Sequence, residues 1–190
     1  MKRLAALLAL ALALSGCSGM RLIDNRVSSF APHSVPSGAR YRFERLPSQQ
    51  TAQQDRLENL AEQSLGKMGL LKSDVGAGLL VNVSTSKRVQ SGNPNAGLDV
   101  HLGWVLGHGA AGVRQRSVLA DLHTQTLYIR EVSLIVRDAA TQTVLLETHA
   151  SNDNLWPDDA PILAAMLDAA LQGFPKPPTG MRQVDIEIPR

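Results

Sequence analysis

The sequence has a single cysteine, no apolar run long enough to cross a membrane, and no excess of charge beyond its first residues. Cys17 is the only cysteine among 190 residues, so it has no partner for an intramolecular disulfide. The longest unbroken apolar run, residues 4–14, would rise about 17 Å as a helix, against a hydrocarbon core of about 30 Å. This run is therefore too short for a transmembrane anchor.

Charge is balanced in the rest of the chain. Lys2 and Arg3 account for the whole excess of 19 basic over 17 acidic residues. Proteins bind nucleic acids by neutralising phosphates with clustered Lys and Arg. We therefore expect no nucleic-acid partner.

The first 16 residues have the order of a secretory signal peptide, because the basic pair Lys2 and Arg3 precedes the apolar run. The four residues Leu14-Ser15-Gly16-Cys17, at the end of this segment, resemble the bacterial lipobox, in which small residues precede a cysteine that is acylated. The resemblance implies cleavage between Gly16 and Cys17 and palmitate or related acyl chains on Cys17. The alternative is an ordinary secretory signal that happens to contain a cysteine.

An unpaired cysteine in an exported protein needs an explanation, and acylation provides one. Each methylene of a buried acyl chain contributes about 0.8 kcal/mol, so several chains anchor a protein almost permanently. The residue after Cys17 is Ser18, whereas an Asp there is associated with inner-membrane retention in enterobacterial lipoproteins. The resemblance thus implies a lipid anchor in the outer membrane, with the domain facing the periplasm.

We predict one folded domain behind a tether. Residues 17–38 are mostly polar and contain Pro32 and Pro36, which is typical of an extended lipidated tether. Residues 39–190 are long enough for one domain with a core of its own.

The hydrophobic pattern of residues 39–190 predicts an α+β fold. Apolar residues alternate with polar ones in residues 40–44, 79–84, 124–136, 144–150 and 184–188, which predicts five strands. Residues 51–69 and 158–174 have apolar residues at helical spacing, with Thr51 and Asp158 or Asp159 as capping residues. We expect an antiparallel or mixed sheet of about five strands with two amphipathic helices packed on one face.

A glycine-rich loop interrupts this pattern at residues 90–122. Loops of this length in compact domains are usually functional or disordered. Its apolar centre contains Leu102, Trp104, Val105 and Leu106, which we interpret as a contact surface for a partner.

Four segments in the last third of the chain carry a family resemblance. They are Tyr128-Ile129-Arg130-Glu131-Val132-Ser133-Leu134, Arg137-Asp138, Glu147-Thr148-His149-Ala150-Ser151-Asn152 and Ala164-Ala165-Met166-Leu167-Asp168-Ala169-Ala170-Leu171-Gln172-Gly173-Phe174-Pro175. With them the chain resembles a family of uncharacterised bacterial lipoproteins, the domain of unknown function 4136 (DUF4136). The resemblance implies a small α+β domain behind a lipobox and gives no activity or catalytic residues.

The Ser-x-x-Lys spacing occurs twice, at Ser64 to Lys67 and at Ser84 to Lys87. That motif marks penicillin-binding enzymes only together with Ser-Asp-Asn and Lys-Thr-Gly elements, which the chain lacks. Ser64 shares the buried stripe of its predicted helix, so we expect it to pack rather than react.

Two further sets of side chains have weak chemical signals. Asp99, His101 and His108 in the glycine-rich loop, with His123 beyond it, match no metal-ligand spacing. Glu147 and His149 share one face of a predicted strand, which we interpret as a solvated surface pair. We predict no catalytic residue, cofactor or metal.

The sequence therefore favours a non-catalytic interaction or scaffolding module held at the outer membrane through Cys17. The alternative is a protein that binds a small ligand or an envelope component on its sheet. A less favoured alternative is an envelope hydrolase, which pockets lined by Asp121, His123, Glu147 or His149 would support.

Overall fold

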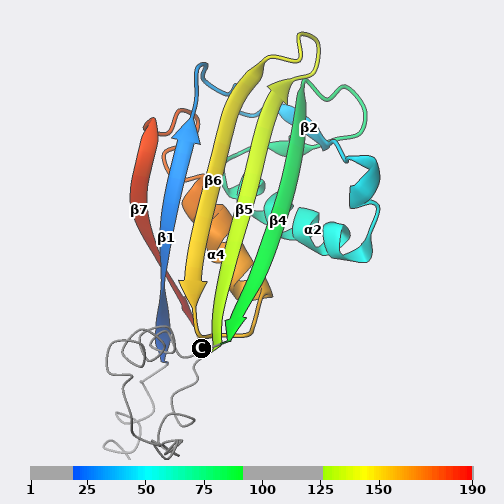
Figure 1. The fold of residues 1–190 in the computed structure, drawn as a ribbon. Helices are drawn as coiled ribbons and strands as arrows, with labels where there is room; N and C mark the ends of the chain where they lie inside the picture. Colours follow the sequence, from blue (N-terminus) through cyan, green and yellow to red (C-terminus); the bar gives the residue numbers. More distant parts are fainter. Residues whose placement is uncertain (1–18, 92–125, 190) are drawn as a thin grey trace, which may run out of the picture.

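The computed structural model describes residues 19–91 and 126–189, which form one mixed sheet with two helices (Figure 1). The sheet has seven strands in the order β3-β2-β4-β5-β6-β1-β7. The short β2 runs parallel to its neighbours β3 and β4, and every other neighbouring pair is antiparallel. The strands are β1 (Met20–Phe30), β2 (Arg40–Phe43), β3 (Leu71–Lys72), β4 (Leu79–Ser91), β5 (Thr126–Asp138), β6 (Val144–Asn154) and β7 (Gly180–Pro189); the helices are α2 (Ala52–Lys67) and α4 (Ala160–Ala170), with a 3-10 turn at Pro47–Gln49.

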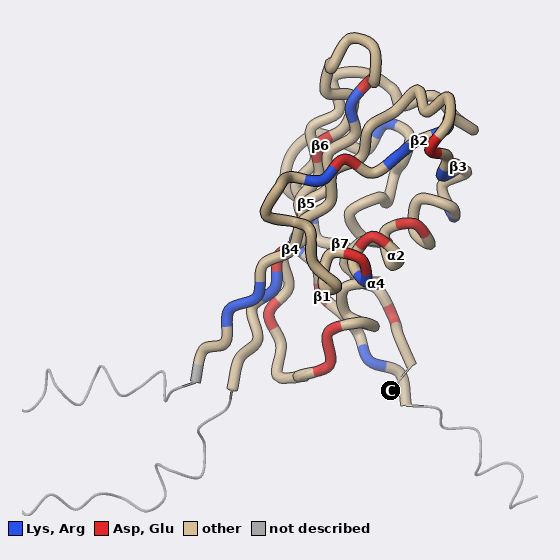
Figure 2. Tube along the Cα trace, turned by 90° about the vertical axis from the view of Figure 1, so that its right-hand side faces the viewer, with Lys and Arg blue, Asp and Glu red and all other residues tan. Residues whose placement is uncertain are grey.

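Both helices cover the same face of the sheet, as an edge-on view shows (Figure 2). Their apolar stripes meet the alternate residues of the strands that point toward them, which buries one continuous core. Fully buried members include Ala61 and Leu65 of α2, Met166 and Leu167 of α4, and Val81, Leu134 and Leu146 of the sheet. The predicted α+β class, the mixed sheet and the placement of both helices on one face are confirmed.

The ends of the helices follow the sequence signals in part. The Thr51 hydroxyl accepts a hydrogen bond from the Gln54 backbone N–H at 3.2 Å, as expected for a residue that caps a helix. Gly69 follows the helix with a φ of 81°, a left-handed conformation that ends α2. Asp159 lies at the N-cap of α4 but makes no capping hydrogen bond, so the capping role predicted for it is wrong.

The predicted tether is wrong, because residues 20–30 of it form β1 inside the sheet. β1 lies between β6 and β7 and pairs with both. Every second residue of β1 from Ile23 on is buried. Asn25 and Ser29 are polar residues at two of these buried positions, so the sequence does not show the alternation of apolar and polar residues that is typical of a strand. The Asn25 amide nitrogen donates to the carbonyls of Ile23 and Val184, at 2.9 and 3.1 Å, whereas the Asn25 Oδ1 is buried without a hydrogen-bond partner among the described residues.

The strand count is seven instead of about five for two reasons. One extra strand is β1, and the other is β3, whose two residues are too few to show any period. The folded domain consequently starts well before residue 39, since β1 begins at Met20.

Truncating β1 on its buried face should destabilise the domain. Ile23 is fully buried, so we expect Ile23→Ala to lower the free energy of unfolding by about 2–5 kcal/mol. The matched control is Leu22→Ala, which removes a half-exposed neighbour on the other face and should cost less than about 1 kcal/mol. Urea denaturation of the chain from residue 17 measures both, and equal small effects would mean that residues 20–30 do not belong to the folded domain.

Candidate functional site

The face of the sheet that the helices leave open has serines at its centre. Side chains alternate along each strand, so every second residue of β4, β5, β6, β1 and β7 points to this face. One row across the strands runs Ser84, Ser133, His149, Ser28 and Met181 by register. The parallel row beside it runs Ser86, Glu131, Ser151 and Arg26.

These rows line a hollow of about 570 Å³, which we call the serine groove. Small side chains cause the hollow, because the next row along the sheet carries Ile135, Glu147 and Phe30, which are larger. The groove is therefore a shallow hollow that crosses the strands, and its serines present hydroxyl groups that both donate and accept hydrogen bonds.

Charged pairs flank the serine groove on both sides. His149 Nε2 lies 2.8 Å from Glu147 Oε1, and Arg26 Nη2 lies 2.9 Å from Asp153 Oδ1. All four side chains are substantially exposed, so each pair contributes little to stability. The predicted surface pair Glu147–His149 is confirmed, and it places an imidazole at the groove.

One side chain of the groove, His149, is of a type that could act as a base for a serine. A serine nucleophile is activated when its hydroxyl is hydrogen-bonded to a base. Within the described residues, no serine hydroxyl is hydrogen-bonded to His149, whose Nε2 is instead bonded to Glu147.

The Ser64 to Lys67 motif forms a link between the two helices. The Ser64 hydroxyl donates to Asp168 Oδ1 at 2.8 Å, and the Lys67 ammonium donates to Asp168 Oδ2 at 2.6 Å. Asp168 belongs to α4, so both motif residues join α2 to α4. The packing role predicted for Ser64 is confirmed, because its side chain is buried.

The second motif is split between the two faces of the sheet. Three residues along a strand place side chains on opposite faces. Ser84 accordingly lines the serine groove, while Lys87 pairs with Asp159 at 2.8 Å on the helix side. In the first motif Ser64 and Lys67 both bind the Asp168 carboxylate, whereas in the second the serine and the lysine lie on opposite faces of the sheet.

Several predicted site residues fall outside the described part of the chain. These are Gly16 and Cys17, the four apolar loop residues Leu102, Trp104, Val105 and Leu106, and the group Asp99, His101, His108, Asp121 and His123. Among residues 19–91 and 126–189, no three His, Cys, Asp or Glu side chains cluster as metal ligands would.

A buried arginine holds the segment before α4 in place. Arg130 is almost completely buried on the helix side of β5. Its guanidinium donates to Asp159 Oδ1 at 2.8 Å and to the Trp156 carbonyl at 2.7 Å. Hydrophobic patterning missed this role, because Arg130 occupies the buried phase of a strand whose other buried residues there are apolar.

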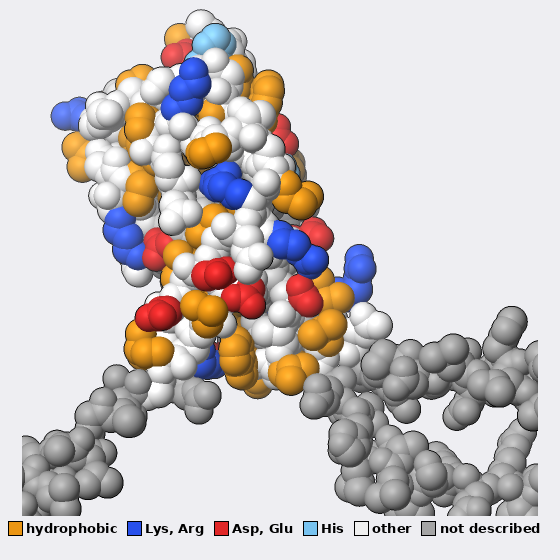
Figure 3. Space-filling model, turned by 90° about the vertical axis from the view of Figure 1, so that its left-hand side faces the viewer, with side chains coloured by type: hydrophobic (Ala, Val, Ile, Leu, Met, Phe, Trp, Pro, Cys, Tyr) orange, Lys and Arg blue, Asp and Glu red, His pale blue; other side chains and the backbone are white. Residues whose placement is uncertain are grey.

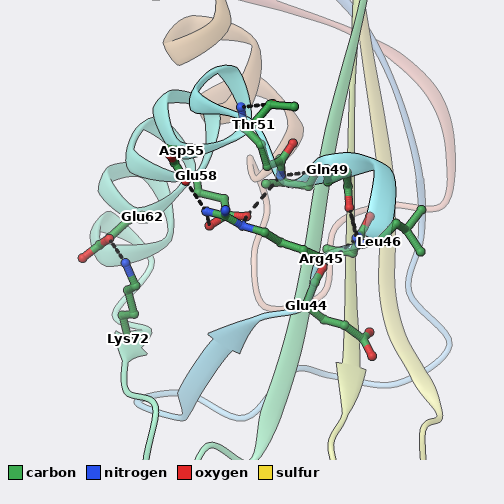
Figure 4. Close-up of polar contacts among 12 residues, drawn as sticks. Glu44, Arg45, Leu46, Gln49, Thr51, Asp55, Glu58, Glu62 and Lys72 are labelled. Atoms are coloured by element: carbon green, nitrogen blue, oxygen red, sulfur yellow. Dashed lines mark hydrogen bonds and ion pairs between the residues drawn. The ribbon is translucent and has the colours of Figure 1, made fainter.

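Two other arginines fix neighbouring segments. Arg21 of β1 donates to both carboxylate oxygens of Asp158, at 3.0 and 2.6 Å, and this guanidinium holds the pKa of Asp158 below its ordinary value of 3.8. Arg45 joins the segment after β2 to α2, donating to both oxygens of Glu58 and to Asp55 at 2.6–2.7 Å (Figure 4). These contacts are structural and lie apart from the serine groove.

Comparison with known proteins identifies no family. No family model matches the chain, and no curated protein matches it significantly. The resemblance to the domain of unknown function 4136 therefore stays a prediction.

Several solved structures are similar at low identity. A PDZ domain protein from Parabacteroides distasonis has a TM-score of 0.49 and 15% identity over 95% of this chain and 42% of its own, so this chain spans less than half of that protein. The PelC dodecamer from Paraburkholderia phytofirmans has a TM-score of 0.47 and 8% identity over 77% of this chain and 94% of its own. A minor lipoprotein from Acinetobacter baumannii has a TM-score of 0.38 and 15% identity over 72% and 88%. Likeness at this level says nothing of what this chain binds.

The Arg21–Asp158 pair predicts an acid-dependent part of the stability. Because folding lowers the pKa of Asp158, its contribution is complete above its ordinary value of 3.8 and is lost as pH falls through the folded-state pKa. We expect wild type to be more stable than Asp158→Asn near neutral pH and the difference to shrink in acid. Urea midpoints from about pH 6 to about pH 2.5 measure this, and a constant difference would show that the carboxylate charge is irrelevant.

Proposed function

We propose that the chain is a lipoprotein of the bacterial outer membrane, anchored through acylated Cys17 and facing the periplasm, whose domain is a non-catalytic interaction module. The signal-like first 16 residues and the lipobox resemblance support the anchor. Within residues 19–91 and 126–189, no helix has the length and apolarity needed to cross a membrane.

The observation that carries the interaction role is the open face of the sheet. Seven strands are covered by helices on one face only, and the other face carries the serine groove. Exposed hydroxyl groups beside a carboxylate, an imidazole and a guanidinium fit a polar partner surface. The loop segment Leu102 to Leu106 is the second contact that we propose, on its apolar composition alone.

Removing the acylation site should change where the protein is found. We expect the wild-type chain to fractionate with the outer membrane and Cys17→Ala to appear in the soluble periplasmic fraction, because no acyl chain then holds it. Separation of the envelope by density gradient, followed by immunoblotting, measures this. Unchanged outer-membrane fractionation of Cys17→Ala would contradict a lipid anchor at this residue.

A photocrosslinker in the serine groove should capture the partner. We expect p-benzoylphenylalanine at Ser133 to give a discrete adduct in intact cells, because Ser133 lies at the centre of the groove. The matched control is the same group at Thr141, an exposed residue of the turn between β5 and β6. No adduct at Ser133, or the same adducts at both positions, would contradict the interaction role of the groove.

Deleting residues 95–114 tests whether the loop contributes to binding in addition to the groove. Loss of the Ser133 adduct in that variant would mean that the partner also needs the loop. An unchanged adduct would remove the basis for the proposed loop contact.

A second candidate function is the binding of a small polar ligand in the same groove. Its volume lies within the range of about 300–1,000 Å³ usual for ligand pockets. A ligand that binds the folded state raises the Tm. A rise with a sugar, amino acid or phosphate ester in wild type but not in Ser133→Trp would favour this candidate.

The hydrolase alternative rests on the placement of His149 at the groove. Covalent labelling of Ser28 or Ser133 by a fluorophosphonate would contradict the non-catalytic proposal. Absence of labelling agrees with the Glu147 contact that occupies His149 Nε2.

A further inference from the structure

Five strands have one of their ends at the same end of the sheet, which we call the anchor end. β1 and β5 begin there, and β4, β6 and β7 end there (Figure 1). The register confirms the alignment, because Met20 pairs with Pro189, Ser91 pairs with Thr126 and Tyr128 pairs with Asn154. The anchor end is therefore a single surface built from both halves of the described chain.

Exposed apolar side chains gather at the anchor end (Figure 3). Of the nine large hydrophobic side chains that the described residues expose, four belong to it: Met20, Leu22, Val89 and Leu155, each about half exposed. They come from the start of β1, the last residues of β4 and the residue after β6. Exposed apolar side chains that gather on one surface favour contact with a lipid surface or a partner.

The distance from Cys17 to β1 favours a lipid surface over a partner as the contact of the anchor end. Cys17 lies three residues before Met20, and three residues span at most about 10 Å when fully extended. Acyl chains on Cys17 must lie in the bilayer, so they would hold Met20 within about this distance of the lipid surface. This short link therefore brings the lipid surface itself to the anchor end.

The charges near the anchor end favour a zwitterionic surface. Of the cations near this end, Arg21 pairs with Asp158 and Lys87 pairs with Asp159, while exposed Arg88 has no ion pair among the described residues. Asp24, Asp185 and Glu187 lie on the open face nearby and would repel anionic lipid. Zwitterionic headgroups impose no such repulsion.

We propose that the anchor end rests on the zwitterionic lipid surface of the membrane and inserts Met20, Leu22 and Leu155 among the headgroups. This inference rests on the proposed lipid anchor. It also sets the height of the serine groove, because eight residues of extended strand separate Met20 from Ser28, or at most about 26 Å. The groove then faces a layer of periplasm close to the membrane.

Depth-dependent fluorescence quenching tests this contact. Acylated Cys17 carries no free thiol, so Leu155→Cys provides one thiol for an environment-sensitive dye at the anchor end. The matched control is Val75→Cys, an exposed apolar residue in the turn that leads into the far end of β4. The full lipidated chain is incorporated into phosphatidylcholine vesicles that contain a lipid with a brominated acyl chain.

We expect quenching several-fold stronger at position 155 than at position 75, and Leu22→Cys should behave like Leu155→Cys. Equal, weak quenching at all three positions, with the chain still bound to vesicles, would overturn the contact and leave the lipid anchor intact. A chain that does not associate with vesicles at all would overturn both the anchor and the contact. The three patterns are distinct, so the failure of one proposal is not mistaken for that of the other.

Discussion

The position of β1 between β6 and β7 is the constraint on which the other features depend. Without this strand, β7 has no neighbour in the sheet and the buried positions Ile23 and Val27 have no place in the core. The pairing with β7 extends over Met20 to Ser29, almost the whole of the strand. It draws the N-terminal segment into the domain. Only Ser18 and Gly19 then remain between Cys17 and Met20, too few residues for a tether.

One face of the sheet packs on the hydrophobic core and the other is open to solvent, and the candidate site lies on the open face. Antiparallel sheets commonly bury one face against a core and leave the other in water. Here both amphipathic helices pack on the same side, joined by Asp168 of α4 with Ser64 and Lys67 of α2. The opposite face has no such cover from the described helices, and its small serines leave a groove instead of a flat surface.

Most elements of the fold could be predicted from the sequence, because their hydrophobic period is clear. The strands at β2, β4, β5, β6 and β7 and both helices lie where the patterns place them. β1 was missed because Asn25 and Ser29 are polar at buried positions, where the Asn25 amide nitrogen is hydrogen-bonded to the Val184 carbonyl and the Ser29 hydroxyl to the Thr148 hydroxyl. Such bonds depend on partners more than 100 residues away, which no local pattern contains.

The candidate site was predictable only within single strands. The Glu147–His149 pair lies on one strand, so alternation alone identified it. The serine groove combines residues from β1, β4, β5 and β6, and its assembly depends on strand order and register. The buried position of Arg130 could not be predicted from the sequence either. Its buried guanidinium is stabilised by Asp159 and by the Trp156 carbonyl, and both contacts depend on the folded arrangement.

The mass of the N-terminal peptide of the mature protein, purified from outer membranes, tests the central claim most directly. The lipid-anchor account predicts that the peptide begins at Cys17 and carries a thioether-linked diacylglycerol and an N-acyl chain. A mature chain that begins at an unmodified residue, or that retains residues 1–16, would contradict it.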